Sequence, residues 1–235
     1  SLWATANDDL RPVMNGVNFA LVDGYLDIVA SDGHVLVKSQ KSLADKVKMN
    51  RCGSFIMPKK VAKILSGIIE PDDYVNIEWN DRKAHIDLFE LDIYFRTIEG
   101  QYPNYNSIIP EQYAHEVSCQ RTVILSALKA VAPFAPDTSQ LLSLTFEGEE
   151  LEVQGEDYDF SLGAEKSIST EGFEGNPLTI GVKSSNMIGI LSKISTRDVL
   201  LKLNDPSRAI IIEAIDDKND DEEFTGLLMP MLIND

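Results

Sequence analysis

Histidine is the residue best suited to acid–base chemistry here, and the chain has three: His34, His85 and His115. His34 follows Asp32 by two positions, a strand spacing that puts both side chains on one face and lets a carboxylate orient an imidazole. Such a pair needs a nucleophile and an oxyanion-stabilising loop, and no motif of either kind accompanies it. The histidines therefore do not predict an enzyme, and we expect no catalytic residues.

Metal and cofactor chemistry is equally weakly supported. The acidic run Asp216–Glu223 (DDKNDDEE) offers oxygen ligands but lacks the glycine and the spacing of an EF-hand, so we expect an exposed hairpin loop. Cys52 and Cys119 lack metal-ligand spacing and are expected to be reduced thiols. No glycine-rich phosphate loop occurs. We expect no metal and no cofactor, and keep an acidic metal-dependent enzyme only as a third alternative.

Composition indicates a globular protein with an uneven charge balance. The 235 residues suffice for two ordinary domains, and the formal net charge of −17 argues against a tight nucleic-acid binder. A net value does not exclude a mildly positive surface within a negative exterior. The apolar runs are too short to span a bilayer and no leader precedes them, so we expect a cytoplasmic protein that does not contact membranes. The first residues, Ser1 and Leu2, indicate a processed chain or an expressed fragment.

An internal repeat organises the chain. Val61–Ile68 (VAKILSGI) recurs 126 positions later as Met187–Ile194 (MIGILSKI). Two more segments recur in the same order at nearly the same offset: Val75–Asp81 as Val199–Asp205, and Arg82–Ile86 as Ser207–Ile211. The sequence therefore predicts two copies of one domain, 1–115 and 116–235.

Each copy reads as antiparallel strands with few helices. Asp23-Gly24 predicts the turn of a hairpin over 17–30, and Glu147-Gly148 predicts its counterpart over 142–154. Third strands are expected at 35–38 and 159–162. A helix over Arg121–Val131 opens copy two, and its equivalent in copy one would end near Ala6 with its start missing. The predicted fold class is α+β, with two tandem domains of antiparallel sheets packed against two helices each.

The repeated helix of copy one has two different faces. The apolar stripe, which we expect to pack on a sheet, comprises Val61, Ile64, Leu65 and Ile68. The opposite face carries Lys59, Lys60, Lys63 and Gly67, whereas the helices of copy two offer mainly Lys129 and Lys193. Taken alone, these lysines fit a solvated surface as well as a surface that faces DNA. No aromatic platform or groove-reading helix is evident, so any DNA contact would be independent of base sequence.

The C-terminal segment Leu227–Ile233 (LLMPMLI) predicts an apolar last strand interrupted by Pro230, which cannot donate to a sheet. Exposed terminal strands usually carry charge. Two methionines instead suit a groove that accepts several apolar peptides, because their side chains are flexible. A buried last strand with no role beyond packing is the alternative.

Four segments, in order, resemble the bacterial DNA polymerase III β subunit, the sliding clamp family. Arg11–Val17 (RPVMNGV) is similar to its R-x-x-L-N-G segment, and Val29–Leu36 (VASDGHVL) to its V-A-T-D-G-H-R-L segment. Gly100–Tyr105 (GQYPNY) with Ile108–Pro110 resembles G-x-(F/Y)-P-D-Y and an aliphatic-proline end, and Leu228–Met231 resembles the closing M-P-M strand. The resemblance covers the second and third of the three domains in that family.

The resemblance implies a hydrophobic pocket between these two domains that receives short partner peptides. Carried over position by position, it would comprise Met14, Ser31, Gly33, His34, Leu36, Pro103, Ile108, Leu227, Leu228, Met229, Pro230 and Met231. The family's helices line a central hole, which implies that the lysines facing DNA are Lys59, Lys60, Lys63, Lys129 and Lys193. Neither set includes a catalytic residue.

The implied function is that of a non-catalytic processivity factor. Its full-length form would be a homodimeric ring around double-stranded DNA, and DNA polymerase, the clamp loader and repair proteins would dock through short hydrophobic peptides. The family's first domain is missing here, so we expect this chain to be monomeric or differently associated. The second hypothesis is a clamp-fold adaptor that binds peptides without encircling DNA.

Three departures from the family pattern bear on the implied pocket. Val35, Ser107 and Leu232 stand where basic residues occur in the family. These replacements imply a more apolar partner peptide.

Overall fold

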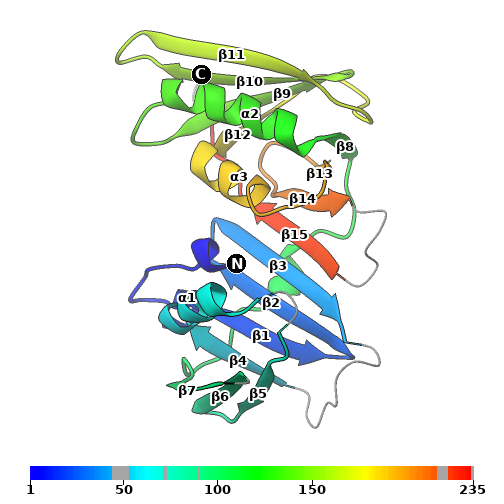
Figure 1. Cartoon of the computed structure of the whole chain (residues 1–235). Coiled ribbons are helices and arrows are strands. Elements are labelled where there is room, and N and C mark those ends of the chain that lie inside the picture. The colour runs from blue at the N-terminus through cyan, green and yellow to red at the C-terminus, as the bar shows by residue number, and fades with distance from the viewer. Residues whose placement is uncertain (44–52, 71–72, 89, 216–221, 234–235) are drawn as a thin grey trace. The chain divides into compact units, whose positions relative to one another are not determined.

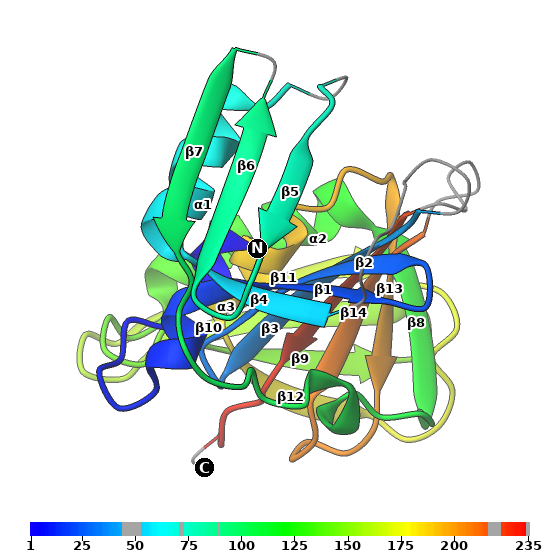
Figure 2. The same cartoon turned by 90° about the horizontal axis from the view of Figure 1, so that it is seen from below.

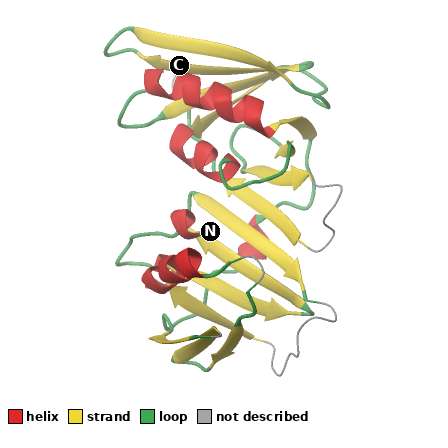
Figure 3. Ribbon diagram, in the orientation of Figure 1, coloured by secondary structure: helices red, strands yellow, loops and turns green. Residues whose placement is uncertain are grey.

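A computed structural model describes residues 1–43, 53–70, 73–88, 90–215 and 222–233 (Figure 1). Two compact units comprise Ser1–Asn104 and Tyr105–Asp235. Strands dominate both units, and the described residues include three α-helices (Figure 3). None of the described helices has the length and apolar character required to cross a membrane.

The boundary between the units falls earlier than the sequence predicts. Residues 105–115 belong to the second unit instead of the first. Ala114 N donates to Leu203 O at 3.0 Å, and Lys202 Nζ lies 5.2 Å from the centroid of the Tyr113 ring. These contacts tie the connecting segment to the second unit.

The first unit is built on an antiparallel sheet. Its strands have the order β4–β1–β2–β3, with β1 at Gly16–Val22, β2 at Tyr25–Ser31, β3 at Val35–Ser42 and β4 at Gly53–Pro58. Asp23 and Gly24 adopt positive φ values of 49° and 86° in the turn between β1 and β2. This geometry matches the twist of a two-residue hairpin, as the Asp-Gly pair predicts.

A separate three-stranded sheet, β5–β6–β7, lies beside α1 in the first unit (Figure 2). The elements are α1 at Lys59–Ile68, β5 at Asn76–Trp79, β6 at Lys83–Leu88 and β7 at Leu91–Arg96. A buried cluster of Phe55, Met57, Leu65, Ala84 and Ile86 joins β4, α1 and β6. Two short 3-10 helices precede β1: η1 at Leu2–Ala4 and η2 at Pro12–Asn15.

The packing of α1 differs from the prediction. Leu65 is buried and Val61 packs against the core, as expected. Ile64 and Ile68 are 47% and 41% exposed, although they belong to the predicted apolar stripe. The helix contacts the sheet through Val61, Ala62 and Leu65, and no described element covers the side of the helix that carries Ile64 and Ile68.

The second unit contains two antiparallel sheets. One has the order β15–β14–β13–β8, with β8 at His115–Gln120, β13 at Asp198–Leu203, β14 at Ile210–Ile215 and β15 at Glu222–Leu228. The other has the order β11–β10–β9–β12, with β9 at Leu141–Glu147, β10 at Glu150–Asp157, β11 at Leu162–Ser169 and β12 at Leu178–Lys183. A bridge between Ser118 and Glu171 connects the sheets, with backbone bonds of 2.8 and 3.0 Å.

Two α-helices pack side by side on the sheets of the second unit (Figure 1): α2 at Arg121–Val131 and α3 at Ser184–Leu191. Ile124, Leu128 and Val131 of α2 are buried, which confirms the predicted stripe. The 3-10 helices of this unit are η3 at Tyr105–Ile108 and η4 at Ala132–Phe134.

Two strand predictions in the second unit are wrong. The third strand is β11, not 159–162, because Asp157 Oδ1 accepts bonds from Asp159 N and Phe160 N and makes that segment a turn. The last strand ends at Leu228, because Pro230 has no N–H with which to continue the ladder. Most of the acidic run, 216–221, lies outside the described residues.

Candidate functional site

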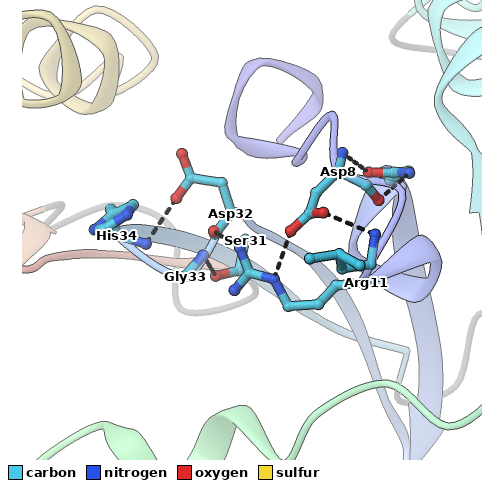
Figure 4. Close-up of polar contacts among 8 residues, drawn as sticks. Asp8, Arg11, Ser31, Asp32, Gly33 and His34 are labelled. Atoms are coloured by element: carbon cyan, nitrogen blue, oxygen red, sulfur yellow. Dashed lines mark hydrogen bonds and ion pairs between the residues drawn. The ribbon is translucent and has the colours of Figure 1, made fainter.

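A self-bonded loop between β2 and β3 forms the centre of the candidate site in the first unit (Figure 4). Ser31 Oγ donates to Val35 O at 2.8 Å and accepts from Gly33 N at 3.1 Å. Asp32 Oδ1 accepts from His34 N and Val35 N, both at 2.8 Å. Gly33 has a φ of +92°, where a side chain is strained. The loop therefore has a fixed shape that depends on Ser31, Asp32 and Gly33.

Arg11 braces this loop from the side. Its Nη2 donates to Asp32 O at 3.2 Å, and its Nε donates to Asp8 Oδ2 at 2.9 Å (Figure 4). Asn15 in turn bonds both backbone groups of Asp8, at 2.9 Å each. The Arg11 hydrogen bond holds the pKa of the Asp8 carboxyl below its ordinary value. The conformation of the segment before β1 is thus linked to the loop after β2.

A third segment of the same unit, 100–103, reaches this region. Gly100 has a φ of +123°, and a Cβ there would lie 2.7 Å from Val13 Cγ1, so the two segments touch. Burial raises the pKa of Tyr102 to about 12, and the nearby Ser31 backbone opposes this rise. Segments 11–16, 31–36 and 100–103 therefore converge within the first unit.

The predicted pocket residues of this unit fall into two groups. Met14, Ser31 and Leu36 are buried, so they support the loop and do not present a surface. Gly33, His34 and Pro103 are exposed. We call the surface of Arg11, Gly33, His34 and Pro103 the first half-site.

The C-terminal segment supplies the predicted pocket residues of the second unit. Leu227 and Leu228 are buried in β15, where they pair with Ile211 and Ile210 of β14. Beyond the strand, Met229 is 40% exposed, and Pro230 and Met231 are half-buried. Ile108, in η3, is 52% exposed. We call the surface of Ile108, Met229, Pro230 and Met231 the second half-site.

Gly181 of β12 holds this segment, and the sequence reasoning missed it. Met231 N donates to Gly181 O at 2.8 Å. A Cβ at Gly181 would lie 2.5 Å from Met231 O and 2.9 Å from Ile233 Cγ1. Only glycine lets the C-terminal segment lie this close to β12.

The α-helices carry a distinctive charge pattern. None of α1, α2 and α3 contains Asp or Glu, although the chain has 38 acidic residues. The predicted cations Lys59, Lys60, Lys63, Lys129 and Lys193 are all exposed. Arg121 is committed elsewhere, because its side chain donates to Thr196 O and Leu191 O near the end of α3. The helix faces are therefore positive or neutral on an acidic protein.

Acidic residues concentrate in the second unit. Residues 105–235 contain 23 Asp and Glu against nine Lys and Arg, whereas residues 1–104 contain 15 against 12. Many lie on β9, β10 and the turns beside them, away from the helices: Glu147, Glu149, Glu150, Glu152, Glu156 and Asp157. In this unit α2 and α3 thus carry no acidic residue, whereas the strands carry acidic residues together with Lys166, Lys183 and Lys202.

The histidines and cysteines considered for catalysis or metal binding have ordinary structural surroundings. His34 contacts Asp32 through its backbone N–H, while His85 Nε2 lies 2.6 Å from Asp92 Oδ1 and its ring stacks on Tyr94 at 4.3 Å. Burial raises the pKa of the Cys119 thiol to about 12, and Asp198 adds to this rise. Within the described part of the chain, no group of three His, Cys, Asp or Glu residues is arranged to hold a metal ion. Cys52 lies outside the described residues.

The fold and its repeat define a protein with two tandem clamp domains. A family model described as the DNA polymerase III beta subunit, central domain, matches residues 2–104, and the C-terminal domain model of the same subunit matches residues 106–232. The chain belongs to the DNA polymerase III β subunit family.

Known relatives agree with this assignment. The beta sliding clamp of Synechococcus elongatus is 23% identical over 240 residues, covering 98% of this chain and 61% of that protein. The Bacillus subtilis sliding clamp structure matches with a TM-score of 0.90 at 20% identity, covering all of this chain and 60% of that one. The Pseudomonas aeruginosa sliding clamp bound to griselimycin matches with a TM-score of 0.88 at 23% identity, covering 99% and 61%. The chain spans about six tenths of the length of these relatives.

Arg11, Asp8 and Gly181 are the site residues that the sequence reasoning did not select. Arg11 and Asn15 belong to the quoted segment RPVMNGV, so the motif itself was the available signal for Arg11. Asp8 lies just outside that segment, and nothing in its sequence context separates it from Asp9. Its role follows only from the ion pair.

Proposed function

We propose that this chain is the middle and C-terminal part of a DNA sliding clamp. The complete protein would encircle double-stranded DNA as a ring, and the two half-sites would together form one pocket for peptides from DNA polymerase, the clamp loader and repair proteins. The role involves binding only, with no catalytic residue and no cofactor. It would be carried out in the cytoplasm.

The absence of acidic residues from all three α-helices carries this proposal. A chain with 38 Asp and Glu would ordinarily place several on exposed helix faces, yet the charged residues of these three helices are all basic: Lys59, Lys60, Lys63, Arg121 and Lys129. A weakly positive surface attracts phosphates, while few strong contacts leave the ring able to slide. Acid on the strands of the second unit would repel DNA from that side.

The half-sites support the second part of the proposal. Each combines exposed apolar or glycine surface with a rigid support: the self-bonded loop in the first unit, and the segment seated on Gly181 in the second. Two or three apolar anchors contribute about 1.5–3 kcal/mol each and are partly offset by ordering costs, so micromolar affinity (about −8 kcal/mol) is expected. That a related clamp binds griselimycin agrees with a ligand-binding role for this fold.

One observation favours the alternative, a peptide-binding adaptor that does not encircle DNA. In the second unit the predicted DNA contacts are Lys129 of α2 and Lys193, which follows the end of α3, within a unit that has 14 more acidic than basic residues. An adaptor would need the half-sites but not the helix cations.

Isothermal titration calorimetry tests the pocket. We expect an acetylated, amidated peptide of Gln followed by Leu and Phe anchors to bind with micromolar affinity. Met229→Asp should weaken binding at least tenfold, because it places a charge on an exposed apolar contact. Leu91→Asp, which changes a similarly exposed apolar residue outside both half-sites, is the matched control. No binding at high micromolar concentration would count against both functions.

A topological assay separates the two functions. The protein expressed from its complete gene is loaded by its cognate clamp loader onto a nicked circular plasmid. A sliding clamp stays on the circle and leaves when the DNA is linearised, because a ring slides off free ends. Equal retention on circular and linear DNA would support the adaptor.

A further inference from the structure

Arg11 is the one cation of the first half-site, and it is paired. Its Nε lies 2.9 Å from Asp8 Oδ2, and the side chains of Arg11 and Asp8 are 49% and 28% exposed. The carboxylate is held independently of the arginine, because Asp8 Oδ1 accepts from Leu10 N at 2.8 Å and Asn15 bonds both backbone groups of Asp8. Asp8 is therefore fixed at the position where it meets the guanidinium.

The guanidinium also faces the loop that the half-site presents. Arg11 Nη2 donates to Asp32 O, and Nη1 lies 2.7 Å from where a Cβ of Gly33 would be (Figure 4). Among the described residues, Nη1 donates no hydrogen bond. The Nη1 donor thus lies at the exposed Gly33 surface. The Nε and Nη2 donors are already bonded to Asp8 and Asp32, and the Asp8 carboxylate offsets much of the positive charge.

The other predicted pocket residues of this unit carry no second permanent positive charge. Val35 is buried and uncharged, and His34 is the only other basic side chain among the pocket residues. The other carboxylate of this loop, Asp32, accepts hydrogen bonds from His34 N and Val35 N, whereas Asp8 is the carboxylate that pairs with Arg11. Arginine pairs most strongly with carboxylates.

We propose that Asp8 determines ligand specificity, by offsetting the charge of Arg11 so that the half-site selects uncharged peptides over peptides that carry a carboxylate. This inference rests on the proposed peptide-binding function. With Asp8 present, an incoming carboxylate competes with a side chain already in place. With Asp8 neutral, Arg11 keeps its bond to Asp32 O and offers its full charge to the ligand.

The test compares two pairs of peptides with identical apolar anchors. Within each pair a single charge differs: an N-terminal succinyl against an acetyl group, and a C-terminal carboxylate against an amide. Calorimetry at low salt gives the ratio of dissociation constants, charged over neutral, for the wild-type chain, Asp8→Asn and Arg11→Gln. The matched control is Asp9→Asn, because Asp9 is exposed and makes no ion pair among the described contacts. Fluorescence melts monitor folding, since both tryptophans, Trp3 and Trp79, lie in the first unit.

We expect Asp8→Asn to lower the ratio about three- to tenfold for at least one pair, the size of one partly exposed charge-assisted contact. Asp9→Asn should change it less than twofold, and Asp8→Asn combined with Arg11→Gln should restore the wild-type ratio. If both peptides of a pair bind and Asp8→Asn leaves the ratio unchanged, this inference alone is overturned. The same holds if Asp9→Asn changes the ratio as much as Asp8→Asn does. Failure of the wild-type chain to bind any of the four peptides overturns the proposed function and this inference with it.

Discussion

Ile64 and Ile190 occupy the same position of the internal repeat, but Ile64 of α1 is 47% exposed whereas Ile190 of α3 is fully buried. The next repeated pair behaves alike, with Ile68 exposed and Ile194 buried. In the second unit, α3 packs against α2 and β15, and Ile190 lies against Gly226 of β15. These two positions of the apolar stripe are thus covered in the second unit and exposed in the first, where Val61 and Leu65 alone of the stripe pack on the core.

The same substitution should therefore have different costs at the two repeated positions. Ile64→Gln is expected to change the free energy of unfolding by no more than about 0.5 kcal/mol. Ile190→Gln should cost about 2–5 kcal/mol, because it buries an amide where an aliphatic side chain packed. Urea unfolding followed by circular dichroism measures both, with tryptophan fluorescence as a separate probe of the first unit. Equal costs would show that α1 is covered in solution.

Adding a side chain at Gly181 should displace the C-terminal segment. Gly181→Val places atoms within 3 Å of Met231 O and Ile233 Cγ1, so residues 229–233 must move from β12. We expect loss of peptide binding in calorimetry and faster cleavage of the C-terminus by carboxypeptidase. Gly67→Ala is the control, because it meets open space on α1 and should stabilise the chain by up to about 1 kcal/mol. If Gly181→Val binds the peptide as tightly as the wild-type chain, the contact between Gly181 and the C-terminal segment has no role in peptide binding.

Alkaline pH should destabilise the chain through Cys119. Its pKa is raised to about 12 in the folded state from an ordinary value of 9.0, so its contribution is complete below about pH 9 and is lost as pH rises through 12. The slope is at most about 1.4 kcal/mol per pH unit for one proton. Unfolding free energies from pH 8 to 11, in a Cys52→Ser background, should fall more steeply with Cys119 than with Cys119→Ala. Parallel pH profiles would contradict this.

Lysines on α1 should contribute more to DNA binding than lysines on strands. Reversing Lys59, Lys60 and Lys63 to Glu should weaken the salt-dependent affinity of the chain for duplex DNA. It should also reduce the slope of log affinity against log salt by about one for each phosphate that a lysine no longer neutralises. Lys166→Glu, at an exposed position on β11, is the control and should have little effect. Fluorescence anisotropy at low and at near-physiological salt provides the measurement, and equal effects on both surfaces would argue against DNA-facing helices.

Features with a local signature were predictable from sequence. The hairpins follow from Asp23-Gly24 and Gly148, whose backbone conformations require or favour those residues. The helix Arg121–Val131 follows from its apolar stripe. The repeat and the four motif segments identified the family and the two of its domains that the chain contains.

Features that depend on distant partners were not predictable. The stripe of α1 marks apolar residues, but it does not say whether another element covers Ile64. The Asp8–Arg11 pair is important because Arg11 also bonds Asp32 of a loop about twenty residues further along the chain. A hydrophobic periodicity in the sequence cannot indicate such a contact. In the sequence, nothing distinguishes Gly181 from the other 13 of the 14 glycines. Its importance follows from the structure, in which the C-terminal segment packs directly against it.

The departure of the chain from β15 at Pro230 has a consequence for exchange among ligands. Beyond that proline, the described residues reconnect to the sheets only at the bridge between Met231 and Gly181. Detaching a segment held by one bridge requires far less free energy than opening a paired strand. At the proposed peptide site, the flexible methionine side chains would then adapt to peptides of different shape, and one peptide could replace another without disturbing the β14–β15 pairing.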